Sequence, residues 1–199
     1  MQPVRSYLTR LLHLAILMVV IHQLLTSTVM ERPMPGDDPE LPYSLHTWMG
    51  TGGLFLLTLF WLWTLVRDRA ETRLSQLVPW FSPRRLRSIG DEALGVARHI
   101  VRLRAPSLDV PAISSAVHGL GLLLATFLAA SGAAWFFAFT GGPYGRIVLG
   151  LHKLAGDLMW AYLIGHASMA LLHQALGDKV FSRMFGFGAQ ARNSPAPAE

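Results

Sequence analysis

The sequence predicts an all-α integral membrane protein, a bundle of four membrane-spanning helices with both termini in the cytoplasm. Of its 199 residues, 52% are hydrophobic and only 15% are charged, against about a quarter charged in soluble domains. The charged residues are crowded into the gaps between four long apolar stretches. Because each stretch has close to the ~20 residues needed to cross a hydrocarbon core of ~30 Å, we expect four spans.

We expect the four helices over residues 11–29, 43–66, 112–139 and 147–176. A soluble bundle would show polar residues every three or four positions, and these stretches do not. The first one resembles a secretory signal, but it is long, contains two histidines and lacks a convincing cleavage site, so we interpret it as a retained helix. The prediction is one membrane domain over residues 1–188.

The placement of basic residues predicts the orientation. Of the 17 Lys and Arg residues, 14 lie in the N-terminal segment, the connection 67–111 and the C-terminal tail, which share one side of the membrane if four helices cross it. Arg32, Arg146 and Lys153 lie on the other side. Basic residues favour the cytoplasmic side, so we expect a multi-pass protein of the bacterial inner membrane. The net charge of +5 then faces anionic lipid and is no sign of nucleic-acid binding.

The connection 67–111 contains an amphipathic pattern. Ser88, with Asp91 three residues later, resembles the capping box that begins a helix. Five apolar residues would then share one helical face: Ala93, Leu94, Ala97, Ile100 and Val101. This pattern suits a helix lying on the membrane surface, and a solvated linker is the alternative. Residues 189–199 are small, polar and rich in proline, so we expect a disordered tail.

The histidines are the candidate functional residues, because seven of the eight lie in the expected helices. Ionisable residues are costly inside a membrane and usually face the bundle interior or a functional site. The helix directions place His13 near the cytoplasmic surface and His46 and His152 near the periplasmic surface. His166 follows His152 by 14 residues, which is about 21 Å further along the helix and within about 40° of the same face. This spacing predicts two bis-imidazole sites at two depths.

Heme fits these sites better than a bare metal ion does. The chain has no cysteine, which excludes disulfides, iron–sulfur clusters and covalent c-type heme. Each site offers two nitrogens, whereas zinc takes three or four protein ligands. Glycines near the ligand positions leave room for a flat macrocycle between helices, or they serve close helix packing alone. They are Gly50, Gly52, Gly53, Gly119, Gly121, Gly156 and Gly165.

The segments around these histidines resemble the bacterial cytochrome b561 family, which is grouped with the b subunits of nickel–iron hydrogenases. The informative segments are RLLHLAI around His13, LHTWMG around His46, and LHKLAGDLMWAYLIGHASMALLH on the last helix. The resemblance implies two non-covalent b-type hemes, with His13 and His166 as ligands of the cytoplasmic heme and His46 and His152 as ligands of the periplasmic heme. The chain departs from short family members in its longer, arginine-rich connection before the third helix.

The remaining histidines have competing interpretations. His118 lies near the cytoplasmic end of the third helix and is a rival ligand or a hydrogen-bond donor to a propionate. His22 lies about 180° around the helix from His13, which favours packing or the lipid interface. His173 could accept a proton at a quinone site or extend to the membrane surface. His99, in the connection, is expected on a solvated face.

Charged residues on the last helix also need an interpretation. Lys153 and Arg146 flank His152 at the periplasmic end, where we expect them to hold heme propionates. Asp157 follows Lys153 by four residues, which is the spacing of an intrahelical ion pair.

These features predict electron transfer across the inner membrane between the quinone pool and a redox partner, with ubiquinone as the exchangeable partner. The resemblance leaves two further functions open, a superoxide oxidase that uses ubiquinone as acceptor and a membrane anchor for a periplasmic dehydrogenase or hydrogenase. Whether the chain is an enzyme therefore stays open. A histidine-lined metal transporter is the alternative from another class, and the scarcity of acidic residues within the helices disfavours it.

Overall fold

The computed structural model of this chain describes residues 6–34, 36–67, 74–101, 110–140, 142–177 and 180–185. Four of its helices are long and apolar enough to cross a membrane, which confirms the predicted fold class. They are α1 (Tyr7–Val29), α2 (Leu41–Val66), α5 (Pro111–Ala138) and α6 (Gly142–Ala175). The predicted tail, residues 189–199, lies outside the described residues.

The spanning helices begin one to five residues earlier than the apolar pattern indicates. The Ser6 hydroxyl accepts a hydrogen bond from the backbone N–H of Thr9 at 3.3 Å, so α1 begins at Tyr7. Pro42 occupies the first turn of α2, where a missing N–H costs nothing. Hydrophobicity therefore locates the spans, and a side-chain cap and a proline mark where α1 and α2 begin.

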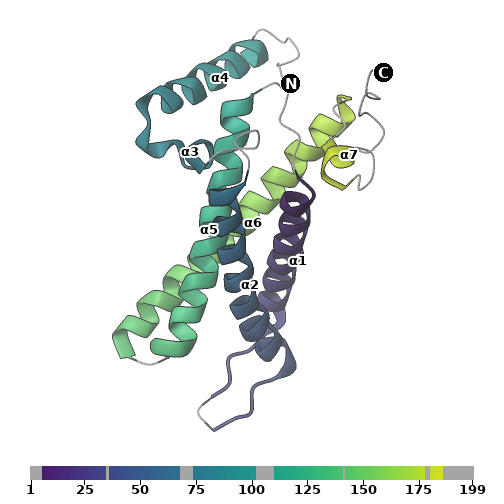
Figure 1. The fold of residues 1–199 in the computed structure, drawn as a ribbon. Coiled ribbons are helices and arrows are strands. Elements are labelled where there is room, and N and C mark those ends of the chain that lie inside the picture. The colour runs from purple at the N-terminus through teal and green to yellow at the C-terminus, as the bar shows by residue number, and fades with distance from the viewer. Residues whose placement is uncertain are drawn as a thin grey trace.

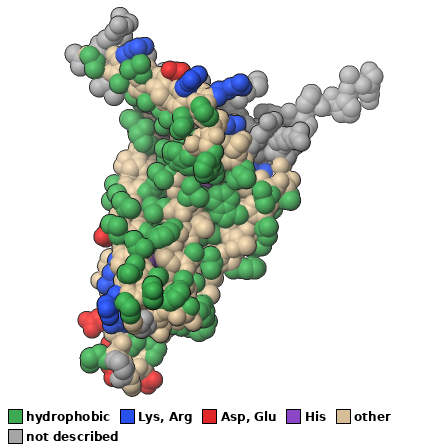
Figure 2. All heavy atoms as spheres, turned by 90° about the vertical axis from the view of Figure 1, so that its left-hand side faces the viewer, with side chains coloured by type: hydrophobic (Ala, Val, Ile, Leu, Met, Phe, Trp, Pro, Cys, Tyr) green, Lys and Arg blue, Asp and Glu red, His purple; other side chains and the backbone are tan. Residues whose placement is uncertain are grey.

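The four helices pack in sequence, α1 along α2, α2 along α5, and α5 along α6 (Figure 1). One buried residue from each meets in the middle of the bundle, namely Leu24, Leu57, Ala125 and Met159. Around this core the outer face is largely hydrophobic, and Lys and Arg gather towards the two ends (Figure 2). Such a surface is typical of a protein surrounded by lipid.

A tight turn joins α5 to α6. Gly142 has a φ of +74°, a backbone conformation that side chains with a Cβ rarely adopt. A Cβ at Gly145 would collide with the backbone carbonyl of Phe139. The two glycines therefore allow α6 to turn back immediately along α5, which sets the depth of the residues on both helices.

The connection between α2 and α5 is largely helical. It contains α3 (Leu74–Leu77), the 3-10 turn η1 (Pro79–Phe81) and α4 (Pro83–Val101). The predicted amphipathic helix is therefore present, but the cap predicted at Ser88 is wrong. Ser88 lies inside α4, and its hydroxyl donates to the carbonyl of Arg84 at 3.1 Å.

Glu92 of α4 fastens this helix to α5. Its carboxylate accepts the N–H groups of Ala112 at 3.0 Å and Ile113 at 2.9 Å. These belong to the first turn of α5, whose donors have no partner within the helix. The connection is thus attached to the end of the bundle at which α1 begins. The short helix α7 (Val180–Phe185) also lies at this end (Figure 1).

Candidate functional site

Two histidines from different helices meet at the end of the bundle opposite α4. His46 lies in the second turn of α2, and His152 lies in the third turn of α6. Their ring centroids are 6.2 Å apart and their planes are nearly perpendicular, at 87°. The structure therefore brings together the two histidines proposed from the sequence as the periplasmic pair.

Hydrogen bonding assigns the proton on the His46 ring. Its Nδ1 lies 3.1 Å from the hydroxyl of Thr26 on α1. That hydroxyl has one proton, which it donates to the carbonyl of His22 at 2.8 Å. The Thr26 oxygen is then available to accept from His46, and we infer that Nδ1 is protonated and that the lone pair is on Nε2. An imidazole held in this way presents Nε2 to a metal.

His152 is oriented in the same way, by a hydroxyl of a neighbouring helix. Its Nδ1 lies 3.0 Å from the hydroxyl of Ser131 on α5, and that hydroxyl donates its own proton to the carbonyl of Leu128 at 3.2 Å. With the Ser131 proton on that carbonyl, we infer that Nδ1 of His152 is the donor and that Nε2 keeps its lone pair. A hydroxyl from a neighbouring helix thus orients each of the two rings. We call His46, His152, Thr26 and Ser131 the His46 site.

The His46 site fits a metal held between two axial imidazoles. Two metal–nitrogen bonds of about 2 Å and two ring half-widths of about 1 Å place the centroids about 6 Å apart, close to the observed 6.2 Å. Among the described residues, no three His, Cys, Asp or Glu side chains gather to hold a metal ion. A pair of imidazoles is enough for heme, whose macrocycle supplies the other ligands.

A glycine on α5 makes room for His152. A Cβ at Gly132 would lie 3.0 Å from Cε1 of that ring, closer than two carbons pack without strain. Gly50, expected beside the macrocycle, is one turn beyond His46 and faces α1. A Cβ there would lie 3.3 Å from Oε1 of Gln23. Gly132 therefore shapes the His46 site directly, and Gly50 sets how closely α2 approaches α1.

At the other end of α6, two aromatic side chains surround His166. The Tyr162 ring stacks on the imidazole with centroids 5.4 Å apart and planes 10° apart. His118 of α5 approaches edge-on, with centroids 5.0 Å apart. Its Nδ1 lies 2.6 Å from the carbonyl of Ser114 and must donate to it. We call His118, Tyr162 and His166 the His166 cluster.

The separation within this cluster differs from that of the His46 site. A metal between two imidazoles needs centroids about 6 Å apart, and His118 and His166 are only 5.0 Å apart. Their contact is therefore that of packed rings. The Gly121 backbone makes room for Tyr162, since a Cβ there would overlap the phenol ring.

The fourth candidate ligand, His13, lies in the second turn of α1, at the end of the bundle that holds the His166 cluster. A hydrogen bond of 2.9 Å from the Trp63 indole to the Thr9 hydroxyl ties this end of α1 to α2. Arg10, one turn before His13, is 7% exposed. A buried arginine in a membrane helix faces the bundle interior. Arg10 is therefore part of the polar interior at this end of the bundle, and it is also one of the basic residues that predict the orientation.

The other candidates lie nearer the surface. The side chains of Arg146, Lys153 and Asp157 are exposed on α6. His173 is half-buried near the end of α6. His22 is half-buried on α1, and its Nδ1 is enclosed with no hydrogen-bond partner among the described atoms. The side chain of His99 lies outside the described residues.

Sequence reasoning missed the residues that orient the ligands. Thr26, Ser131 and Gly132 looked like ordinary small residues of membrane helices. Depth was the available signal, because Thr26 lies near the end of its helix and His46 near the beginning of the next. Two helices joined by a short connection run antiparallel, so such positions lie at one level of the membrane.

Comparison with protein families gives one match, the model of prokaryotic cytochrome b561, over residues 4–187. Nothing among curated proteins or solved structures matches the chain. The matched range includes all four spanning helices and every histidine discussed above.

Proposed function

The chain belongs to the prokaryotic cytochrome b561 family, and from this premise we propose that it is a diheme b-type cytochrome that transfers electrons across the bacterial inner membrane between the quinone pool and a redox partner. Membership makes it a membrane protein that binds b-type heme and transfers electrons. The number of hemes, the quinone and the direction of transfer belong to the proposal. The observation that supports it best is the His46 site, with its 6.2 Å ring separation and two oriented Nε2 atoms.

We assign the axial ligands in two pairs, His46 with His152 and His13 with His166. The first pair rests on the geometry of the His46 site. The second rests on His13 and His166 lying at one end of the bundle, on helices that are not closely packed partners among the described residues. A flat macrocycle would lie between two such helices and contact both. His118 is the competing ligand, and its 5.0 Å approach to His166 leaves too little room for a metal between them.

The protein would orient the ligating imidazoles and enclose the hemes. Heme would supply one-electron iron chemistry when bound, and the two histidine pairs assigned above would hold it. Thr26 and Ser131 keep the His46 and His152 rings in one tautomer, which raises the basicity of the ligating nitrogen. The apolar core formed by Leu24, Leu57, Ala125 and Met159 lies between the two depths and excludes water.

Charge beside the His46 site would position the heme propionates. We propose Arg146 and Lys153 for this role, because both flank His152 near the beginning of α6 and their exposed side chains can reach the surface of the site. Bonds between cationic side chains and carboxylates are among the stronger hydrogen bonds in proteins. The Arg146→Gln and Lys153→Gln variants test the role, which predicts a lower reduction potential for the heme of the His46 site alone.

The first experiment is an optical spectrum of the purified protein with and without dithionite, combined with heme quantification. We expect a Soret band, a reduced α band and two hemes per chain. One heme per chain would overturn the two-site proposal. The second experiment reconstitutes the protein in vesicles and follows heme reduction by ubiquinol. No reduction by quinol would remove the quinone from the proposal and leave the heme assignment standing.

The same preparation separates the two other functions that the family resemblance leaves open. Superoxide from an enzymatic source should leave heme reduction unchanged if the protein is a quinol-linked relay. Fast reduction by superoxide with net formation of ubiquinol would instead identify a superoxide oxidase. Stable co-purification with a periplasmic dehydrogenase or hydrogenase would identify a membrane anchor.

A further inference from the structure

The connection between α2 and α5 carries an exposed apolar surface outside the four spans. On α4, Leu86 is 43% exposed, Leu94 48% and Val101 82%, and Ala93 and Ala97 are exposed as well. At ~100° per residue these five side chains fall within one third of the helix circumference. We call them the α4 stripe. The opposite side of α4 contains the polar residues Ser88 and Arg84, both exposed.

The side of α4 that packs on the bundle is a different one. Glu92 holds that side against the first turn of α5, and Ile89 and Val96 on the same side are half-buried. The α4 stripe lies next to this side and remains uncovered in the described part of the chain. An exposed apolar stripe on a helix beside membrane spans marks a surface that lipid or another protein covers.

The segment before α4 reaches the depth of the spans. The Leu77 backbone lies against Gly119, so closely that a Cβ at Gly119 would overlap it. Gly119 is eight residues into α5, about 12 Å along the helix from its first residue. Phe81 and Trp80, which follow, are 90% and 44% exposed. Aromatic side chains in such a place are typical of the membrane–water interface.

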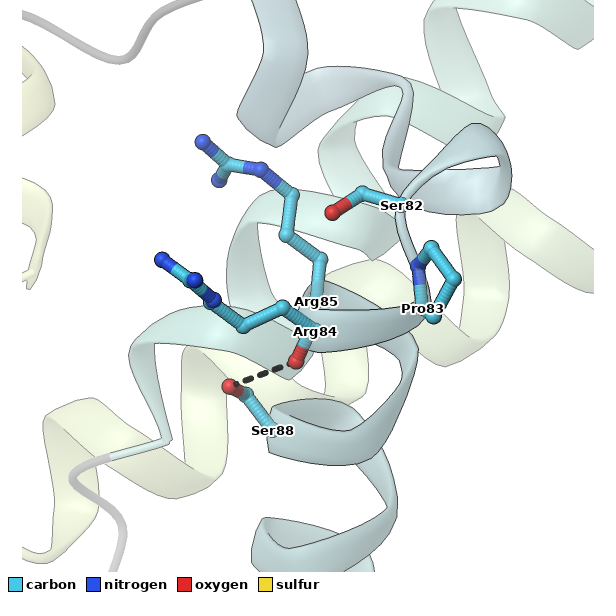
Figure 3. Close-up of a pocket in the computed structure, with 5 residues that line it drawn as sticks. All are labelled: Ser82, Pro83, Arg84, Arg85 and Ser88. Atoms are coloured by element: carbon cyan, nitrogen blue, oxygen red, sulfur yellow. Dashed lines mark hydrogen bonds between the residues drawn. The ribbon is translucent and has the colours of Figure 1, made fainter.

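The charge of α4 suits the same position. Arg87 and Arg98 are exposed on the side that adjoins the α4 stripe. Figure 3 shows Arg84 and Arg85 extending in parallel from the beginning of α4, beside Ser82 and Ser88, and Arg85 donates to the Ser75 hydroxyl at 2.9 Å. Cationic side chains next to an apolar face favour a surface of anionic lipid.

We propose that α4 lies in the headgroup region of the adjacent leaflet, with the α4 stripe towards the acyl chains and its arginines on anionic lipid phosphates. Glu92 would then couple this surface helix to the first turn of α5, the helix that contributes His118 one and a half turns further on. The partner is the anionic lipid surface itself, and a second copy of the chain is the competing occupant.

The absence of cysteine from the sequence makes the test clean. Ala97→Cys lies on the α4 stripe, and Ser88→Cys is nine residues away, about 180° around the helix. Each single cysteine receives a nitroxide label in the full-length heme-loaded protein, which is reconstituted in phosphatidylcholine nanodiscs with and without phosphatidylglycerol. Power-saturation EPR then measures collisions with oxygen, which concentrates in lipid, and with a water-soluble nickel chelate.

We expect the Ala97→Cys label to collide several-fold more with oxygen than with nickel, and the Ser88→Cys label to show the reverse. Adding phosphatidylglycerol should lower the nickel collisions at Ala97→Cys further. Equal nickel collisions at both positions would overturn the proposal in favour of a solvated helix. An Ala97→Cys label shielded from both reagents would overturn it in favour of a protein-covered face. An unchanged Soret band in both variants verifies the fold.

Discussion

The two ends of α6 hold histidines in different ways. At His152, a partner imidazole stands 6.2 Å away and neighbouring hydroxyls hold both rings. At His166, the nearest rings are Tyr162 and His118, stacked and edge-on at 5.4 and 5.0 Å. The difference teaches that the fold alone brings two imidazoles together at the His152 end, whereas at the other end it places Tyr162 and His118 against His166, and the ligand partner proposed for His166 lies on α1.

Removing a ligand of the His46 site should have the largest effect. In the His46→Ala or His152→Ala variant, one axial imidazole is lost, and we expect the heme content to fall from two per chain to one. The measurement is the pyridine hemochrome assay on purified protein. His173→Ala is the matched control, because it removes an imidazole from the same helix outside both pairs. Retention of both hemes in His46→Ala would contradict the assignment.

Substitutions at the other end compare the two rival ligands. If His13 is the partner of His166, then His13→Ala loses one heme, whereas His118→Ala retains both and alters only the environment of His166. Heme quantification decides between them, and the reduced-minus-oxidised spectrum shows which heme remains. Loss of one heme in His118→Ala, with both retained in His13→Ala, would instead assign His118 as the ligand. The His118 and His166 rings, now 5.0 Å apart, would then have to move apart when heme binds.

Loss of the orienting hydroxyls should have a smaller and more specific effect. The Thr26→Val and Ser131→Ala variants each remove the acceptor of an imidazole N–H, and such partners are worth about 10–100-fold in metal affinity. The ligand becomes less basic and stabilises ferric iron less, so the reduction potential of that heme should rise. Redox titration measures the shift.

Thr58→Val provides the control for the hydroxyl variants. Among the described residues, the exposed Thr58 hydroxyl bonds to the carbonyl of Leu54 in its own helix, so its loss should leave both potentials unchanged. A shift in Thr58→Val as large as that in Thr26→Val would indicate a general effect of removing hydroxyls from the membrane helices.

Crowding His152 should have a weaker effect. A Cβ in Gly132→Ala would press on the imidazole at 3.0 Å, and overpacking of this kind costs at least about 1 kcal/mol. We expect roughly fivefold weaker heme binding at the His46 site and no change at the other site. Gly150→Ala on α6 is the control, because a Cβ there meets no atom within 4 Å. Equal heme binding in both variants would show that Gly132 does not shape the site.

The sequence predicted the spans within a few residues because length and hydrophobicity alone determine what crosses a membrane. It also pointed to His46 with His152, because helix direction and spacing set the depth of each histidine. It did not reveal Ser131 or Gly132, whose roles depend on how α5 rotates against α6. The cap predicted at Ser88 failed for a similar reason, since Glu92 and the turn before Pro83 determine where that helix lies.

The smallest expected effect tests how α1 is held at the His13 end. The Trp63 indole donates to Thr9, one turn before His13, and links α1 to α2. The Trp61 indole donates to Thr126 at 3.0 Å and links α2 to α5.

Each of these two hydrogen bonds should contribute about 0.5–1.5 kcal/mol. Trp63→Phe should therefore weaken the His13 heme selectively, by a few-fold, because α2 is the close packing partner of α1. Trp61→Phe should show no such selectivity. Heme retention measured by competition with apomyoglobin resolves the two, and equal losses from both sites in Trp63→Phe would mean that the bond stabilises the whole bundle and does not position His13.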